Sequence, residues 1–292
     1  MTTESRDDAL QSDTSEAFTH LLGQRVKVMQ PARGYRIGMD GALLAAACAG
    51  AISRRRKPLA ALELGCGAGG ALLSLKARCP DLDLTGIERE PVYADLARRN
   101  VLLNAMHNIA IIESDIGKGY KATFALPGLA GRQHGEGGPP SGSGRGQAVD
   151  DKASSHPRFD LVFSNPPYFD DPDTLRPPHE AKRPAWIADD GLGAWLDFAL
   201  AAVKDGGDIV FIHRADRLSD ILSGLSDKAG SFMVRPIQPF AGKDAKRVIV
   251  RAKRLGRAPL RLLPPLILHD GGVRKHTDEV EAILAGAGDL SW

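Results

Sequence analysis

The sequence has few cysteines, little net charge and no long apolar run. Three cysteines among 292 residues form no C-x-x-C pair, which argues against a disulfide framework or a metal centre and favours reduced core thiols. A net charge of +2 excludes a chain that is basic throughout, so a nucleic-acid surface would have to be local. No apolar run reaches the ~18 residues of a membrane span. The acidic, polar residues 1–16 do not resemble a signal peptide, so we expect a cytoplasmic protein.

Short apolar segments alternate with helix-like segments from residue 59 onward. Because the strand-like segments are continuous and aliphatic, both of their faces are expected to be covered. This order predicts an α/β fold: a doubly wound, mostly parallel, seven-stranded Rossmann-like sheet with ligands at the carboxyl ends of its strands. Residues 232–239 and 247–253 have no helix between them and predict an antiparallel hairpin at one edge. The other expected strands are 59–64, 82–87, 109–113, 159–164 and 208–212, and the expected helices are 70–79, 91–106, 193–204 and 217–228.

A glycine-rich turn follows the first of these strands, where residues 62–69 read LELGCGAG. Without a Cβ, the backbone at Gly65, Gly67 and Gly69 can approach a ligand closely. Dinucleotide-binding turns have G-x-G-x-x-G spacing and seat a pyrophosphate. The carboxylate of Glu63 would repel a pyrophosphate but attract the ammonium group of a methionine, which favours S-adenosylmethionine as cofactor. The alternative is a plain turn between strand and helix with surplus glycine.

Acidic residues also end the next two strands. Glu88 is placed to accept hydrogen bonds from both hydroxyls of a ribose, although an ordinary charge at a strand end is the alternative. Asp115 is placed to accept from the exocyclic amine of the cofactor's adenine, with Glu113 as the less favoured choice. The two positions extend the predicted cofactor site along the same edge of the sheet.

The tetrapeptide Asn165-Pro166-Pro167-Tyr168 follows the strand at 159–164 and is the candidate for catalysis. The Asn165 side-chain oxygen and the Pro166 carbonyl can both accept hydrogen bonds from one planar NH2 group. Such contacts would localise the nitrogen lone pair and aim it at an activated methyl group. The prolines hold the loop without competing N–H groups, and Tyr168 offers a stacking face for a flat substrate. The alternative is that two prolines merely end a buried strand.

This tetrapeptide, downstream of the glycine turn, resembles the class I amino-methyltransferases that use S-adenosylmethionine. These enzymes act on adenine N6, on cytosine N4 or on glutamine amides. Residues 30–45, which read QPARGYRIGMDGALLA, look like the N-terminal signature of the bacterial enzymes that methylate N6 of adenosine 37 in a valine tRNA. In that family the region of Asp40 lies over the cofactor, so the resemblance implies a cofactor contact for Asp40. A helix N-cap is the alternative reading of this residue.

The resemblance and the composition together predict four segments. Half of residues 127–158 are glycine, proline or serine, which predicts a flexible insertion within the main domain. The expected segments are a disordered tail at 1–16, an N-terminal segment over the cofactor site at 17–58, the methyltransferase domain at 59–255 and a C-terminal extension at 256–292.

Basic residues near the end of the main domain favour RNA, most of all tRNA, as the partner. Residues 241–261 hold eight lysines and arginines against one acid. An edge strand protected from aggregation by its charges is the alternative.

The rival functions are protein glutamine N5-methylation and nucleic-acid binding by an inactive methyltransferase fold. The basic residues proposed to contact RNA are Lys182, Arg183, Lys246, Arg247 and Arg251.

Overall fold

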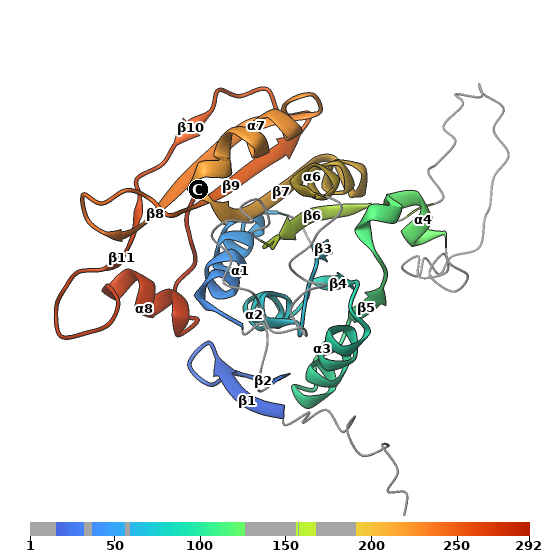
Figure 1. Cartoon of the computed structure of the whole chain (residues 1–292), viewed down its shortest axis with the longest axis horizontal. Helices are drawn as coiled ribbons and strands as arrows, with labels where there is room; N and C mark the ends of the chain where they lie inside the picture. Colours follow the sequence, from blue (N-terminus) through green and yellow to red (C-terminus); the bar gives the residue numbers. More distant parts are fainter. Residues whose placement is uncertain (1–15, 32–36, 56–58, 126–155, 157, 168–190) are drawn as a thin grey trace, which may run out of the picture.

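The computed structural model describes residues 16–31, 37–55, 59–125, 156, 158–167 and 191–292. Its centre is a sheet of nine described strands in the order β10-β8-β9-β7-β6-β3-β4-β5, with β11 also paired to β8 (Figure 1). The strands β3 to β7 are parallel, whereas β9 runs antiparallel to its neighbours β7 and β8. The bounds are β3 Ala60–Leu64, β4 Asp83–Glu88, β5 Ile109–Glu113, β6 Phe159–Ser164, β7 Val203–Arg214, β8 Ala229–Phe240, β9 Arg247–Arg254, β10 Arg261–Leu262 and β11 Leu266–His269.

Helices cover both faces of the sheet, as a parallel sheet with apolar faces requires. On one face of the sheet, α1, α2 and α8 form a hydrophobic core cluster with side chains of the strands. On the other face, α4, α6 and α7 form a second cluster. A separate ribbon of two strands packs with α2 and α3. The remaining bounds are β1 Glu16–Leu21, β2 Val26–Pro31, α1 Met39–Ile52, α2 Gly70–Arg78, α3 Pro91–Leu103, η1 Ile116–Lys118, α4 Tyr120–Phe124, α6 Gly191–Ala202, η3 Ala215–Arg217, α7 Leu218–Ser226 and α8 Asp278–Leu284.

The helix α1 contacts β6 and β7 of the sheet as well as the helices α2 and α8. Its sequence is rich in alanine, and its residues from Ala42 to Ala49 are all buried. Small side chains let this helix approach its neighbours closely, while Leu43 and Leu44 fill the remaining space. Burying each leucine contributes about 1.5–3 kcal/mol. Alanine also has a high helix propensity, so the same residues favour the helix and its close packing.

The predicted α/β class and the doubly wound sheet are confirmed. The predicted number of seven strands is too low, because β10 and β11 pair with β8 and cover part of the hairpin edge. The sequence hides these strands because β10 has only two residues and prolines lie between the two. The helix N-cap reading of Asp40 is wrong, because Gly38 occupies the N-cap position of α1. Among the described residues, none of the helices is both long and apolar enough to cross a membrane.

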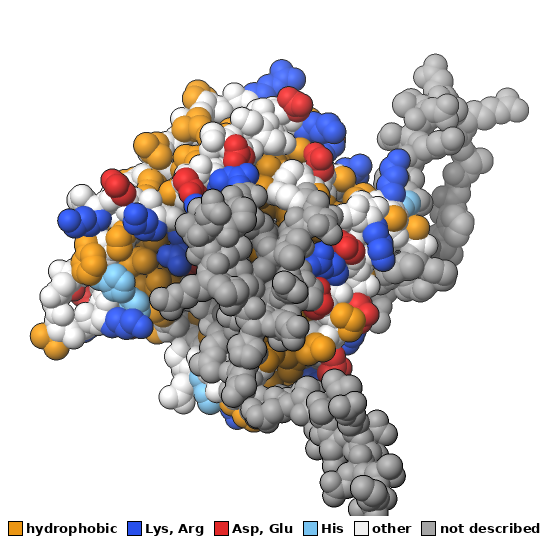
Figure 2. Space-filling view, in the orientation of Figure 1, with side chains coloured by type: hydrophobic (Ala, Val, Ile, Leu, Met, Phe, Trp, Pro, Cys, Tyr) orange, Lys and Arg blue, Asp and Glu red, His pale blue; other side chains and the backbone are white. Residues whose placement is uncertain are grey.

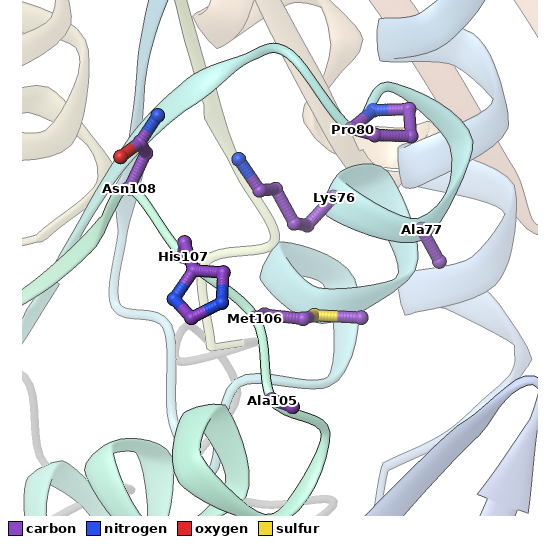
Figure 3. A pocket seen from close by; sticks show the side chains of 7 residues that line it. All are labelled: Lys76, Ala77, Pro80, Ala105, Met106, His107 and Asn108. Carbon is purple, nitrogen blue, oxygen red and sulfur yellow. The ribbon is translucent and has the colours of Figure 1, made fainter.

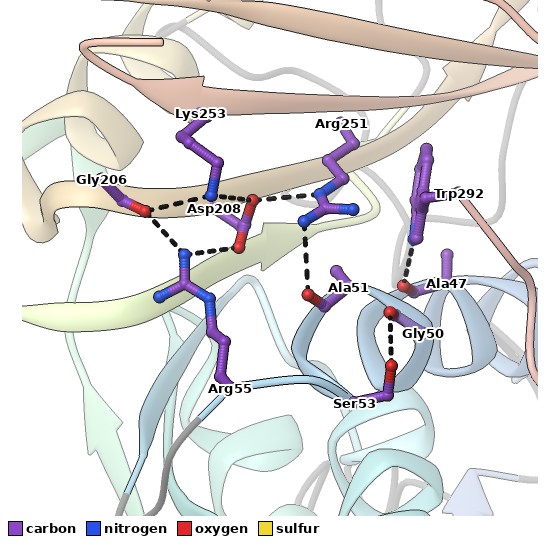
Figure 4. A network of polar contacts seen from close by, with 10 residues as sticks. All are labelled: Ala47, Gly50, Ala51, Ser53, Arg55, Gly206, Asp208, Arg251, Lys253 and Trp292. Atoms are coloured by element: carbon purple, nitrogen blue, oxygen red, sulfur yellow. Dashed lines mark hydrogen bonds and ion pairs between the residues drawn. The ribbon is translucent and has the colours of Figure 1, made fainter.

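A buried carboxylate at the amino end of the parallel strands gathers three cations (Figure 4). The side chain of Asp208 is 0% exposed and forms ion pairs with Arg55 at 2.7 Å, Arg251 at 3.0 Å and Lys253 at 3.5 Å. Arg251 also donates to the Ala51 carbonyl, and its guanidinium lies 5.5 Å from the centre of the Trp292 ring. These contacts tie β7, β9, α1 and the last residues of the chain together.

This network corrects the assignment of Arg251 to an RNA contact. The Arg251 side chain is only 16% exposed and is held by Asp208. Lys253 shares the same counter-charge, and Arg254 pairs with Asp205 at 2.7 Å. The basic run in β9 therefore includes charges that stabilise the fold at the amino edge of the sheet. A count of charges along the sequence cannot show this, because their acidic partners lie more than forty residues away.

Replacing Asp208 with Asn should lower the free energy of unfolding by about 3 kcal/mol, because three cations lose their shared counter-charge. Denaturation with urea measures the change. Asp205→Asn is the matched control, since it removes an exposed partner of Arg254 and should cost less than 1 kcal/mol. Equally small losses in both variants would show that the network contributes little.

Candidate active site

The register of two adjacent parallel strands brings the glycine turn and the tetrapeptide together. Leu64 of β3 pairs with Ser164 of β6, so Gly65 and Asn165 leave the sheet side by side. The Ser164 hydroxyl donates to the Leu64 carbonyl at 2.9 Å and ties the two strand ends together. Asn165 is half-buried, while Pro166 is buried. Tyr168 lies outside the described residues.

The glycine turn has a conformation that few other residues adopt. Its three glycines have positive φ angles, of 64° at Gly65, 54° at Gly67 and 89° at Gly69. The turn is anchored by the Cys66 amide, which donates to the Ile87 carbonyl at 2.9 Å. A Cβ added to Gly67 would meet nothing within 4 Å. This side of the turn is therefore open to a ligand.

Glu88 holds the glycine turn in place. One carboxylate oxygen, Oε2, accepts from the Gly67 amide at 2.8 Å, and Oε1 accepts from the Glu90 amide at 2.9 Å. Burial raises the pKa of Glu88, although these backbone donors oppose the shift. A carboxylate oxygen can accept more than one hydrogen bond, so Glu88 can bind the turn and also accept from a ligand hydroxyl. The contact with Gly67 is a role that the sequence did not reveal.

Glu63 is a buried acid whose charge is not fully compensated. Burial, and then the negative charge of Glu88, raise the pKa of Glu63 well above its ordinary value. Its Oε2 atom has no hydrogen-bond partner within the part of the chain that the structure describes. Burying an ionised carboxylate without a partner is costly, so this atom suits a cationic ligand group.

The two acids at the end of β5, Asp115 and Glu113, have clear structural partners. Asp115 accepts from the Gly117 amide at 2.8 Å and caps η1. It follows Ser114, whose amide donates to the Glu88 carbonyl at 3.0 Å, so Asp115 lies at the strand end next to Glu88. The rival Glu113 is exposed and lies 3.7 Å from Arg98 of α3.

Asp40 links the start of α1 to the start of β9. Its Oδ2 atom accepts from the Arg247 Nε at 2.7 Å, and the Asp40 side chain is largely buried. Arg247 pairs with Arg214 in the sheet, at the same carboxyl edge as Asn165. The structure thus joins a predicted cofactor contact and a predicted RNA contact. Lys182 and Arg183, two further predicted RNA contacts, lie outside the described residues.

A tryptophan that the sequence did not single out lies against the glycine turn. A Cβ added to Gly65 would lie 2.4 Å from the tip of the Trp195 ring. Trp195 belongs to α6, which begins 26 residues after Asn165, and its ring is buried among the side chains of the second core cluster. The sequence shows only that Trp195 lies in a helix that follows the tetrapeptide. It does not show that the ring contacts Gly65.

A cavity of about 300 Å³ lies at the opposite edge of the sheet (Figure 3). It is lined by residues that include Lys76, Met106 and His107. The Lys76 ammonium donates to the Leu82 carbonyl at 2.7 Å, near the start of β4. This cavity is therefore separate from the glycine turn. The residues that the structure describes include no group of three or more side chains suited to bind a metal ion.

Known proteins resemble this chain in sequence and in fold. The tRNA1(Val) (adenine(37)-N6)-methyltransferase of Porphyromonas gingivalis is 27% identical over 233 residues, which cover 77% of each chain. A solved protein from Agrobacterium tumefaciens, described as an O-methyltransferase on the basis of prediction, has a TM-score of 0.61 and 24% identity. That match covers 87% of this chain and 99% of the other, and it supports the fold. No family model matches the chain.

The chain is a class I S-adenosylmethionine-dependent methyltransferase. The release factor glutamine methyltransferase of Escherichia coli is also similar, at 29% identity over 117 residues. That match covers 40% of this chain and 30% of the E. coli enzyme. The residues of this methyltransferase fit the cofactor on two structural grounds: Gly67 leaves open space, and Glu63 has an oxygen without a hydrogen-bond donor in the described part of the chain.

In this methyltransferase, Gly65→Ala should destabilise the fold more than Gly67→Ala. Both variants place a Cβ at positive φ, which costs about 1–2 kcal/mol. Only at Gly65 does that Cβ also overlap the Trp195 ring, which adds about 1–3 kcal/mol. Urea denaturation of both variants without ligand measures the difference. Equal destabilisation would show that Trp195 moves away without cost.

Proposed function

We propose that this methyltransferase transfers a methyl group to N6 of an adenine in RNA, with tRNA near the anticodon as the favoured substrate. The observation that carries the proposal is the placement of Asn165 beside the glycine turn, at the ends of paired strands. The activity for which the P. gingivalis relative is named supports the choice of adenine in tRNA, because the similarity spans 77% of both chains. A tRNA substrate implies action in the cytoplasm.

The catalytic role belongs to the loop after β6. S-adenosylmethionine supplies an electrophilic methyl group when bound. The Asn165 amide oxygen and the Pro166 carbonyl accept from the two hydrogens of the target NH2 group and direct its lone pair toward that methyl. Pro167 keeps the loop rigid, and Tyr168 stacks on the adenine. Because the electrophile is already activated, this arrangement needs no general base before transfer, and the methylated amine loses its proton to water.

The cofactor roles follow the same carboxyl edge. Glu63 faces the ammonium group of the methionine moiety, which supplies the missing partner of its Oε2 atom. Glu88 accepts from the ribose hydroxyls with the lone pairs that Gly67 and Glu90 leave available. Asp115 accepts from the adenine amine at the next strand end. Gly65, Gly67 and Gly69 allow the backbone to approach the methionine moiety.

Asp40 contributes to the same cofactor site from the start of α1. Its contact with Arg247 fixes one carboxylate oxygen at the carboxyl edge. Because a carboxylate oxygen can accept more than one hydrogen bond, Asp40 can also accept from a donor of the cofactor. Arg247 thereby orients Asp40 as well as lying near the predicted RNA path.

Protein glutamine N5-methylation is the second candidate, because a glutamine amide also presents a planar NH2 group. The similarity to the E. coli release factor enzyme supports it, but that similarity spans only 30% of that enzyme. Mass spectrometry separates the two candidates. After incubation with S-adenosylmethionine and unmodified tRNA transcripts, nucleoside analysis should reveal N6-methyladenosine, while a release factor present in the same reaction stays unmodified.

Asn165→Ala should lower kcat at least about 100-fold, because one acceptor for the target amine is lost. Calorimetric titration should show that S-adenosylmethionine still binds, since the glycine turn and its acids are intact. His107→Ala, an exposed change at the opposite edge, is the control and should leave kcat unchanged. A variant of Asn165 with near-normal turnover would contradict the proposed role.

Cofactor affinity should rise with pH because of Glu63. Its raised pKa means that the free protein holds a proton there at mildly acidic pH, whereas the ligand ammonium favours the ionised carboxylate. Binding should therefore release a proton, and affinity should increase until the pH exceeds that raised pKa. Calorimetry in buffers of different ionisation enthalpy measures the protons released. Glu63→Gln should release fewer protons than wild type, and an unchanged number would assign the effect to another group such as Glu88.

A further inference from the structure

The carboxyl edge that holds Asn165 continues to a corner formed by β8 and β11. In the sheet, Arg214 at the end of β7 pairs with Arg247, which also pairs with Ile237 of β8. Phe240, at the end of β8, pairs with His269 at the end of β11. Because β8 and β11 run parallel to β7, both residues lie at the same edge as the tetrapeptide. The glycine turn and this corner therefore share one side of the molecule.

Three rings stand in a row at this corner. The Phe240 and His269 ring centres are 5.3 Å apart, and those of His269 and His276 are 5.0 Å apart with planes 25° from parallel. His276 is buried at one end of the row, whereas Phe240 is 45% exposed at the other. His269 therefore packs against one side of the Phe240 ring, and the rest of the ring is exposed to solvent.

Exposed lysines accompany the rings. Lys243 and Lys246 lie in the turn between β8 and β9, and Lys275 lies in the loop before α8. Figure 2 shows Lys, Arg and His side chains together at the left of the molecule, by the ends of β8 and β11. Two acids are nearby, of which Asp270 accepts from the Gly272 amide of its own loop, and Asp244 is exposed. At the opposite edge, the cations Arg251 and Lys253 are held by Asp208.

We infer that this edge patch, made of Phe240, Lys243, Lys246 and His269 with the buried His276 behind them, binds a single-stranded part of the RNA substrate that flanks the target adenine. The inference rests on the proposed function. A base stacks on Phe240, and the lysines contact the flanking phosphates, which is the combination that recognises single-stranded nucleic acid. Three strand spacings separate β6 from β8, or about 14 Å, and Phe240 lies about 17 Å further along β8 than the level of Asn165. About six stacked nucleotides, at 3.4 Å each, span the resulting distance of about 22 Å.

The stacking contact is tested with substitutions at Phe240. Phe240→Leu keeps an apolar side chain without a flat ring, and it should raise the Kd for an unmodified valine tRNA transcript about fivefold or more. Phe240→Tyr keeps the ring and should bind like wild type. Leu102→Ala, at an exposed position on α3, is the control and should not change binding. If Phe240→Leu and Phe240→Tyr bind RNA equally well, stacking at this ring is excluded.

The phosphate contacts are tested by salt dependence. The double variant Lys243→Ala/Lys246→Ala should reduce the slope of log K against log salt by about 1.4, which corresponds to two single-strand phosphate contacts. Lys228→Ala is the matched control, because this exposed lysine precedes β8 at the amino edge. An unchanged slope in the double variant would remove the lysines from the interface.

These outcomes are distinguishable from failure of the proposed function. In every variant of the edge patch, kcat at saturating RNA and the Kd for S-adenosylmethionine should stay within twofold of wild type. If wild-type protein methylates a release factor and no RNA, the proposed function fails and the inference fails with it. If wild-type protein methylates tRNA but the variants bind tRNA normally, only the edge patch is refuted.

Discussion

The pairing of Leu64 with Ser164 is the constraint on which the site depends. Adjacent parallel strands lie about 4.8 Å apart, so their carboxyl ends place the following residues within reach of one small ligand. The glycine turn and the tetrapeptide are a hundred residues apart in the chain, yet they leave the sheet together. The Ser164 hydroxyl reinforces this alignment by bonding to the Leu64 carbonyl. A shift in this register would separate the two motifs without changing either.

Two buried acids differ in how the free-energy cost of burying a carboxylate charge is offset. Asp208 is surrounded by three cations of the protein, so its charge stabilises the junction of β7, β9 and α1. In the part of the chain that the structure describes, the Oε2 atom of Glu63 has no hydrogen-bond partner, and burial raises the pKa of this acid. A compensated charge is typical of structure, whereas an uncompensated one near an open glycine turn is typical of a ligand site. The contrast separates the structural edge of the sheet from the functional edge.

Much of the fold was predictable because local patterns agree with the tertiary structure. The strands at 109–113 and 159–164 match their predicted bounds, since apolar runs and turns mark them. Trp195 and the partners of Arg251 were not predictable. Their contacts join residues distant in the chain, and no local pattern encodes which side chain a glycine or an arginine will meet. The roles of Glu63, Glu88 and Asp115 toward a cofactor stay predictions.

The sequence by itself determined the α/β class, the positions of the two motifs and the chemistry that their residue types permit. These follow from periodicity and from functional groups, which are local properties of the chain. Only the tertiary structure decided that Asp40 meets Arg247, that Glu88 holds Gly67 and that the basic residues of β9 divide between two edges. Those outcomes depend on strand register and on burial, because a charge becomes structural or available to a partner only when its neighbours in space are known.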